Sequence, residues 1–122
     1  MSELTASLED YLEVIYNLEK DNQRVKPIAI SKELNISRAS VTEALNKLAS
    51  KGYINYGRYE MLSLTQLGVE IASEIVNKHK TIQKFFMDIL GLSKEEASLN
   101  ACRIEHVITD NAYHKISEYI RK

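Results

Sequence analysis

The sequence holds a single cysteine in 122 residues, so it has no internal disulfide and gives no sign of secretion. Its N-terminus lacks the basic region and apolar run of a signal peptide, and no apolar stretch approaches the roughly 20 residues that span a bilayer. One proline and four glycines leave few helix breaks. These absences predict a cytoplasmic, mostly helical protein without a membrane partner.

The net charge of −1 gives no sign of a nucleic-acid partner until the charges are followed along the chain. Residues 1–21 carry six acidic side chains and one lysine, a net of −5. Residues 22–59 carry seven basic and two acidic side chains, a net of +5. A basic block beside an acidic one can hold a phosphate backbone locally while the whole molecule stays nearly neutral.

Apolar residues recur at three- and four-residue steps in the first half of the chain, which predicts helices. Ser7 and Ser37 are placed to cap the first and third helices, Pro27 to open the second, and Asn35 to make the tight turn that follows. Gly52 ends the third helix, and a tyrosine-rich hairpin follows, turning around its one glycine. The expected helices and hairpin are 7–20, 27–35, 37–51 and 53–65.

The second half predicts only helices. Thr65 is placed to cap a long helix that ends at Gly91, and Ser93 and Thr109 open two more. The expected helices are 66–90, 93–108 and 110–121. The fold class is therefore mainly α with a small β-hairpin, in two parts, 1–65 and 66–122.

Two helices joined by a tight turn and followed by a hairpin make a winged helix-turn-helix. The outward residues of its second helix and the hairpin tip are small, polar or charged, as suits contact with bases and phosphates. The candidate DNA-binding residues are Lys26, Ser37, Arg38, Ala39, Ser40, Thr42, Glu43, Lys47, Arg58 and Tyr59. A protein-binding winged helix, or a helical hairpin with a solvated face, fits the same pattern. The sorted charge favours double-stranded DNA.

The stretch C-R-I-E-H places Cys102, Glu105 and His106 at helical positions i, i+3 and i+4, which share one face. A thiolate, a carboxylate and an imidazole on one face can bind a transition metal. Three ligands from one short helix are rarely enough, so further ligands are expected from other elements.

Three residues elsewhere could complete such a site. Asp10 and Glu13 form an i, i+3 carboxylate pair on the first helix, and His79 occupies a position where the long helix expects an apolar residue. Each has an ordinary structural explanation: a cysteine or histidine packed in a core, or acids that stabilise a helix N-terminus. The residues alone leave a metal site and these structural roles equally open.

Five segments in order resemble the diphtheria-toxin-repressor family of metal-activated transcriptional repressors, from about residue 5 to the end. They are D-Y-L-E-V-I-Y-N-L, S-R-A-S-V-T-E-A-L-N-K-L-A-S-K-G, L-S-L-T-Q-L-G, K-H-K-T-I-Q-K-F-F and N-A-C-R-I-E-H-V-I-T-D. The resemblance implies a winged-helix DNA-binding domain, a helical metal-binding and dimerisation domain, and a homodimer on a palindromic operator that controls metal-uptake genes. Longer members add an SH3-like domain, whereas this sequence ends at Lys122 and resembles a short form.

The resemblance also implies the metal ligands, which are Asp10, Glu13, His79, Cys102, Glu105 and His106. Iron-type members have methionine at the position of Asp10 and cysteine at the position of Cys102. Manganese-type members have aspartate at the first of these positions and glutamate at the second. This chain has the manganese-type residue at the first and the iron-type residue at the second, so it is a hybrid. A second iron-type site uses glutamate and histidine where this chain has Gln83 and Ser98, and is expected to be lost. A thiolate favours Fe2+ and carboxylates favour Mn2+, so we expect Fe2+ first and Mn2+ second.

Two other functions fit parts of the pattern. A metal-independent winged-helix regulator would bind its operator equally well in a chelator. A non-haem metalloenzyme would use the same ligand types, but no glycine-rich loop or second catalytic constellation accompanies them. The sequence therefore predicts a regulator that is not an enzyme and has no small-molecule substrate.

Overall fold

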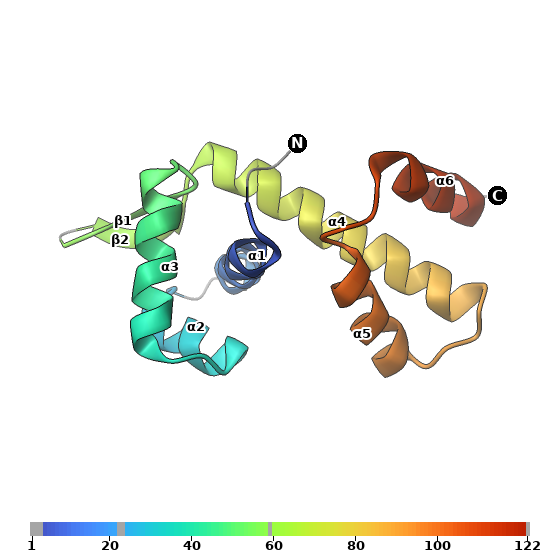
Figure 1. Ribbon diagram of the computed structural model, residues 1–122, viewed down its shortest axis with the longest axis horizontal. Helices are drawn as coiled ribbons and strands as arrows, with labels where there is room; N and C mark the ends of the chain where they lie inside the picture. The colour runs from blue at the N-terminus through green and yellow to red at the C-terminus, as the bar shows by residue number, and fades with distance from the viewer. Residues whose placement is uncertain (1–3, 22–23, 59, 122) are drawn as a thin grey trace. The chain divides into compact units, whose positions relative to one another are not determined.

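The computed structural model describes residues 4–21, 24–58 and 60–121, and within them the chain forms six helices and one hairpin (Figure 1). This confirms the mainly α fold with a small β-hairpin. The contacts divide the chain into two compact units, residues 1–73 and 74–122, and the longest helix belongs to both. The boundary predicted after Thr65 therefore stays a prediction. The elements are α1 (Ala6–Lys20), α2 (Pro27–Leu34), α3 (Arg38–Ser50), β1 (Ile54–Gly57), β2 (Glu60–Leu64), α4 (Gln66–Asp88), α5 (Lys94–Ile104) and α6 (Asp110–Arg121).

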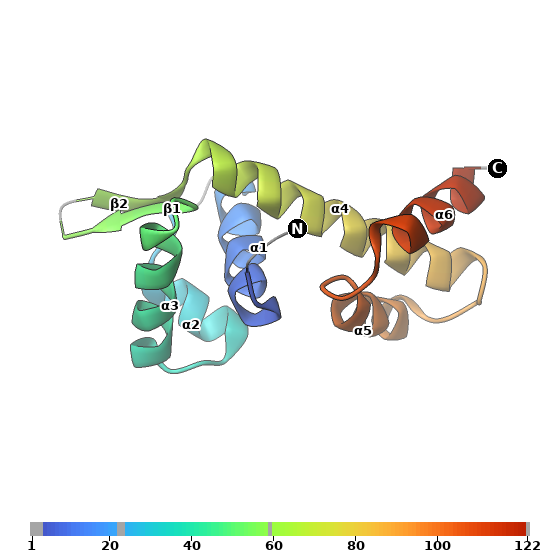
Figure 2. The ribbon, with the colours of Figure 1, turned by 45° about the horizontal axis from the view of Figure 1, so that its top comes forward.

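The helix-turn-helix of the first unit forms as the sequence predicts. Asn35 ends α2 in the left-handed conformation, with φ 54°, and Ser37 caps α3 by accepting a hydrogen bond from the backbone N–H of Ser40. α1, α2 and α3 share one apolar core, seen in Figure 2 as three helices gathered beside the hairpin. Its fully buried side chains are Leu12, Ile15, Ile30, Val41, Leu45 and Leu48.

The start of α1 differs from the prediction. Thr5, not Ser7, is the N-cap, because its Oγ1 accepts a hydrogen bond from the N–H of Leu8 at 3.2 Å. Ser7 therefore lies inside the first turn, where it is exposed. The sequence offered two hydroxyl residues two positions apart, and the apolar spacing did not distinguish them. Leu4, just before the cap, joins the core and favours the earlier start.

The hairpin is the wing of this unit. β1 and β2 are antiparallel, with Ile54 opposite Leu64 and Gly57 opposite Glu60, so the turn lies just after Gly57. Arg58 is exposed in that turn, whereas Tyr59 lies outside the described residues. The wing is joined to α4 by Thr65, which caps α4 as predicted: its Oγ1 accepts from the N–H of Gly68 at 3.1 Å.

The second unit consists of the rest of α4, α5 and α6. Ser93 and Thr109 cap α5 and α6 as predicted, since each hydroxyl accepts a hydrogen bond from an N–H three residues on, both at 3.1 Å. Gly91, with φ 74°, lies just past the end of α4. The buried apolar side chains of the second unit are Ile75, Val76, Ile82, Ala97 and Ala101. Among the described residues, no helix combines the length and apolar character needed to cross a membrane.

The predicted end of α5 is wrong. The prediction extended this helix to residue 108, but it ends at Ile104. The N–H groups of Val107 and Ile108 both donate to the carbonyl of Ile104, at 3.0 and 2.9 Å, so the chain tightens into a turn there. Glu105 is the C-cap residue and His106 lies in the turn, which changes how the predicted ligands are presented.

Candidate metal centre and nucleic-acid interface

Glu105 is a buried carboxylate at the end of α5. Its side chain is 0% exposed, and its backbone N–H donates to the carbonyl of Ala101 at 2.8 Å. Oε1 lies 2.6 Å from Nδ1 of His79, whereas Oε2 has no hydrogen-bond partner among the described residues. Burying a charged group without a full set of partners is costly, so this oxygen calls for an explanation.

Two imidazoles flank this carboxylate. His79, on α4, contacts Oε1 through Nδ1, and its Nε2 lies 3.2 Å from Oγ of Ser98 on α5. His106, from the turn after α5, brings its Nε2 to 3.8 Å from Oε2, beyond hydrogen-bond distance but within that of an ion pair. The side chain of His106 is only 7% exposed. Glu105 therefore lies between two histidines from different elements.

These residues fit a divalent transition metal. One carboxylate and two imidazoles are ligand types that Fe2+, Mn2+ and Zn2+ accept, and the unpartnered oxygen of Glu105 is the atom that a cation would complete. The centre is built from α4 and the end of α5, which lie side by side in Figures 1 and 2. The structure thus places His79 at one oxygen of Glu105 and His106 near the other, although the ligand atoms of the three do not all lie within 4.8 Å of one another. Their joint role as metal ligands stays a prediction.

Cys102 is placed differently from Glu105 although both lie near the end of α5. Its side chain is exposed. In the described part of the second unit, Cys102 belongs to no set of three histidine, cysteine or acidic residues whose ligand atoms all lie within 4.8 Å of one another. Helical spacing put the two residues on one face, but burial separates them, because Glu105 turns toward α4. The role of Cys102 as a ligand stays a prediction.

The two remaining predicted ligands lie in the first unit. Asp10 and Glu13 are both half-buried on α1, one helical turn apart. The spacing predicted from the sequence is therefore present. Their part in a metal site stays a prediction.

Ser98 is a site residue that sequence reasoning treated only as a lost ligand position. It precedes Glu105 by seven residues and the buried Ala101 by three, so the three share one face of α5. That periodicity was a usable signal that Ser98 faces α4. The contact between Ser98 and His79 could not be predicted from the sequence, because it depends on how α4 and α5 pack.

The candidate DNA-binding face is the exposed side of α3. The opposite side of α3 buries Val41, Ala44, Leu45 and Leu48, and all the predicted contact residues on the helix are exposed. Ser37 is already engaged in capping, since its Oγ donates to Oγ of Ser40 at 3.0 Å while accepting from the Ser40 N–H. Lys47 lies 3.6 Å from Glu43, one turn earlier. The exposed candidates are Lys26, Ser37, Arg38, Ala39, Ser40, Thr42, Glu43, Lys47 and Arg58.

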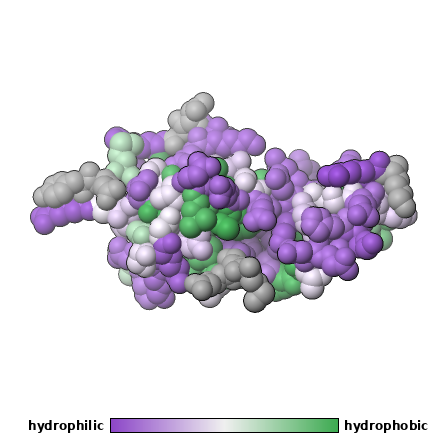
Figure 3. Space-filling model, turned by 90° about the horizontal axis from the view of Figure 1, so that it is seen from above, coloured by the Kyte–Doolittle hydropathy of each residue, from purple (hydrophilic) through white to green (hydrophobic). Residues whose placement is uncertain are grey.

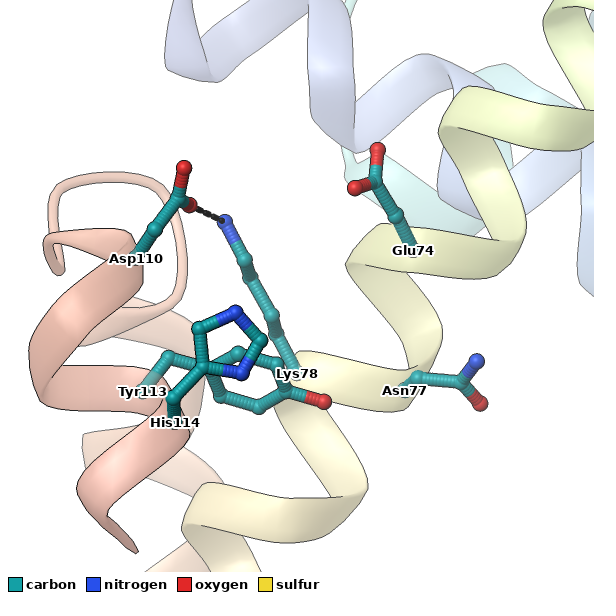
Figure 4. Close-up of a pocket in the computed structure, with 6 residues that line it drawn as sticks. All are labelled: Glu74, Asn77, Lys78, Asp110, Tyr113 and His114. Carbon is teal, nitrogen blue, oxygen red and sulfur yellow. Dashed lines mark ion pairs between the residues drawn. The ribbon is translucent and has the colours of Figure 1, made fainter. Parts of the chain in front are cut away.

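A polar pocket of about 180 Å³ lies between α4 and α6 in the second unit (Figure 4). Lys78 reaches Asp110 at 3.7 Å and stands 5.8 Å from the ring centre of Tyr113. None of the predicted metal ligands lines it, so it is separate from the metal centre. Its lining residues are Glu74, Asn77, Lys78, Asp110, Tyr113 and His114.

Comparison with known families divides the chain into two matched parts. Residues 3–62 match the N-terminal DNA binding domain of the iron dependent repressors, and residues 65–122 match their metal binding and dimerisation domain. This agrees with the family resemblance of the sequence segments.

Individual proteins support the same family. The chain is 40% identical over 120 residues to the uncharacterized HTH-type transcriptional regulator MJ0568 of Methanocaldococcus jannaschii, covering 98% of this chain and 96% of that protein. It is 31% identical over 116 residues to the HTH-type transcriptional regulator MntR of Oceanobacillus iheyensis, covering 95% and 78%.

Among solved structures, that of the manganese regulator SloR matches with a TM-score of 0.85 and 25% identity, covering 97% of this chain and 55% of that protein. The chain thus spans about half the length of that solved protein. The names of all three describe regulators. The chain belongs to the iron-dependent repressor family of metal-dependent transcriptional regulators.

Proposed function

We propose that this chain is a cytoplasmic, metal-dependent transcriptional repressor that binds a palindromic operator as a homodimer and controls metal-uptake genes. The observation that carries the proposal is Glu105: a fully buried carboxylate, held at one oxygen by His79 and without a hydrogen bond at the other. A structural acid would have donors for both oxygens. A metal ligand leaves one for the ion.

The proposed ligands are Asp10, Glu13, His79, Cys102, Glu105 and His106. A bound divalent ion supplies positive charge that draws these acidic and imidazole groups together. Fe2+ is proposed as the physiological ion because Cys102 adds a thiolate, with Mn2+ second because the other ligands are oxygen and nitrogen. Since the proposed ligands come from both units, ion binding would couple the arrangement of the units to metal supply. An ion shifts such an equilibrium only by its differential affinity for the DNA-competent arrangement.

The homodimer is supported by apolar surface in the second unit. α6 has no buried residue among those described, although its sequence is strongly amphipathic. Figure 3 shows one face of the molecule, on which hydrophilic side chains cover most of the surface and some hydrophobic ones lie among them. A second copy could cover the exposed apolar groups and set two recognition helices about 34 Å apart, as a two-fold operator requires. The exposed large apolar side chains are Ile89, Leu90, Leu99, Val107 and Tyr119.

The test is DNA binding measured by fluorescence anisotropy without oxygen, using a labelled duplex selected by the protein from a random-sequence pool. The titration is repeated in chelator and with Fe2+, Mn2+, Co2+ and Zn2+. We expect Fe2+ to strengthen binding about 5- to 150-fold over chelator, the usual range of allosteric coupling. Glu105→Gln should abolish that gain, whereas Glu95→Gln, an exposed acid in the first turn of α5, should keep it.

Two other results of this titration would change the proposal. Stronger activation by Mn2+ than by Fe2+ would reverse the proposed metal order and leave the repressor in place. Equal binding in chelator and in every metal would overturn the proposal and leave a metal-independent winged-helix regulator.

A further inference from the structure

We propose that Ser98 is a positioning residue that fixes His79 so that its Nδ1, and not its Nε2, faces the metal centre. The inference rests on the proposed function and deepens it. It assigns a role to a residue that is not itself a ligand. The geometry that carries it is a chain of two contacts, Glu105 to His79 Nδ1 at 2.6 Å and His79 Nε2 to Ser98 Oγ at 3.2 Å.

The chemistry of imidazole makes the second contact consequential. A neutral ring carries its proton on one nitrogen and offers a lone pair on the other. Without an ion, the 2.6 Å contact is a hydrogen bond from Nδ1–H to the Glu105 carboxylate. For Nδ1 to serve as a ligand, the ion would take the place of that proton, the ring would carry its proton on Nε2, and that N–H would need an acceptor. Oγ of Ser98 is at hydrogen-bond distance and can accept it. A hydroxyl can donate as well as accept, so Ser98 accommodates either tautomer. What it fixes is the ring orientation, because Nε2 is engaged by α5 and Nδ1 is left facing Glu105.

The placement of Ser98 is fixed by the way α5 lies on α4. Ala97 and Ala101, on either side of Ser98 along α5, are fully buried, so this part of α5 packs into the second unit. Gln83 of α4 adds a longer contact, its Nε2 donating to the carbonyl of Lys94 at 3.5 Å in the first turn of α5. A hydroxyl at position 98 is thus held against Nε2 of His79 by packing.

A further consequence concerns the number of ions. Positions 83 and 98, where the sequence predicts the loss of a second site, both contribute contacts between α4 and α5. With Nε2 bonded to Ser98, His79 presents a single nitrogen as a ligand. We therefore expect His79 to serve one ion only.

The experiment measures Co2+ affinity of the full chain by competition with a chromophoric chelator. Partners of a ligating histidine typically contribute 10- to 100-fold to metal affinity, so Ser98→Ala should weaken Co2+ binding by roughly that factor. Ser98→Thr, which keeps the hydroxyl, should restore most of it. The matched control is Ser73→Ala on α4, whose hydroxyl only donates to Glu70 O within its own turn, and it should leave affinity unchanged. Circular dichroism of each metal-free variant reports its folding.

A spectroscopic readout separates positioning from general stability. In the Zn2+-loaded wild type, the two-bond ¹H–¹⁵N spectrum of the imidazoles should show His79 protonated at Nε2 and metal-bound at Nδ1. Ser98→Ala should lose this single pattern. Binding through Nε2 in the wild type, or equal Co2+ affinity in Ser98→Ala, would overturn the inference. If Co2+ binds as expected but DNA binding ignores chelator, the proposed function fails while the role of Ser98 stands. If the wild type binds no Co2+, both fail.

Discussion

Replacing Gly68 with alanine should loosen the junction between the wing and α4. Gly68 lies in the first turn of α4, and a Cβ there would overlap the carbonyl oxygen of Tyr53 and come within 3.1 Å of Leu64 Cδ2. The same carbonyl accepts the N–H of Thr65 at 3.1 Å. Thr65 Oγ1 in turn accepts the N–H of Gly68 and donates to Gly52 O at 2.7 Å. One methyl group therefore meets backbone, which cannot rotate away.

The magnitude follows from these contacts. Forcing a methyl into a packed site costs about 1–3 kcal/mol. Displacing two of these three hydrogen bonds of Thr65 costs about 1 kcal/mol each. The higher helix propensity of alanine returns at most about 1 kcal/mol. We therefore expect the free energy of unfolding to fall by about 2–4 kcal/mol.

The assay is urea unfolding of the metal-free protein followed by circular dichroism. The matched control is Gly91→Ala, where a Cβ would meet nothing within 4 Å but φ is 74°, so only the left-handed backbone is strained. That control should cost about 1–2 kcal/mol. The reasoning would be wrong if Gly68→Ala had the same urea midpoint as the wild type, or a higher midpoint than Gly91→Ala. Either result would mean that the overlap with Tyr53 O does not destabilise the junction between the wing and α4.

Three further predictions concern other parts of the chain. Ile82→Ala, which empties a site only 1% exposed in the second unit, should lower the free energy of unfolding by about 2–5 kcal/mol in the same assay; a loss under 1 kcal/mol would contradict it. Lys47→Ala should weaken DNA binding evenly across sequences and reduce the slope of log affinity against log salt by about 1, and an unchanged slope would remove Lys47 from the phosphate contacts. Cys102→Glu should raise the affinity for Mn2+ relative to Fe2+ in chelator competition, and an unchanged ratio would show that Cys102 does not set metal preference.

The fold was largely predictable because its signals are local. Asn35 and Ser37 define the helix-turn-helix through one backbone conformation and one cap, and both act within four residues. The errors occurred where two local signals competed or where a helix ended without one. Thr5 and Ser7 are both acceptable caps, and no glycine or proline marks the end of α5 at Ile104.

The site was predictable in its residue types and less so in its geometry. His79 interrupts an apolar stripe, and Glu105 follows the buried Ala101 by four residues, so both could be expected to face a neighbouring helix. Cys102 was assigned to the same face by spacing, but its exposure depends on how α5 rotates against α4. The contact of Ser98 with His79 joins residues 19 positions apart, and only tertiary packing determines it.

The energetics of Glu105 indicate why ligands from a single unit would not make an effective switch. A buried acceptor left without a donor costs about 1–3 kcal/mol, so an ion completing Oε2 could recover about that much within the second unit alone. Moving a two-state equilibrium from 1:99 to 99:1 requires about 5.5 kcal/mol of differential binding. Whatever its size, a gain made entirely within the second unit gives no differential affinity between arrangements of the two units. The proposed switch needs ligands whose engagement depends on the first unit, which is the part assigned to Asp10 and Glu13.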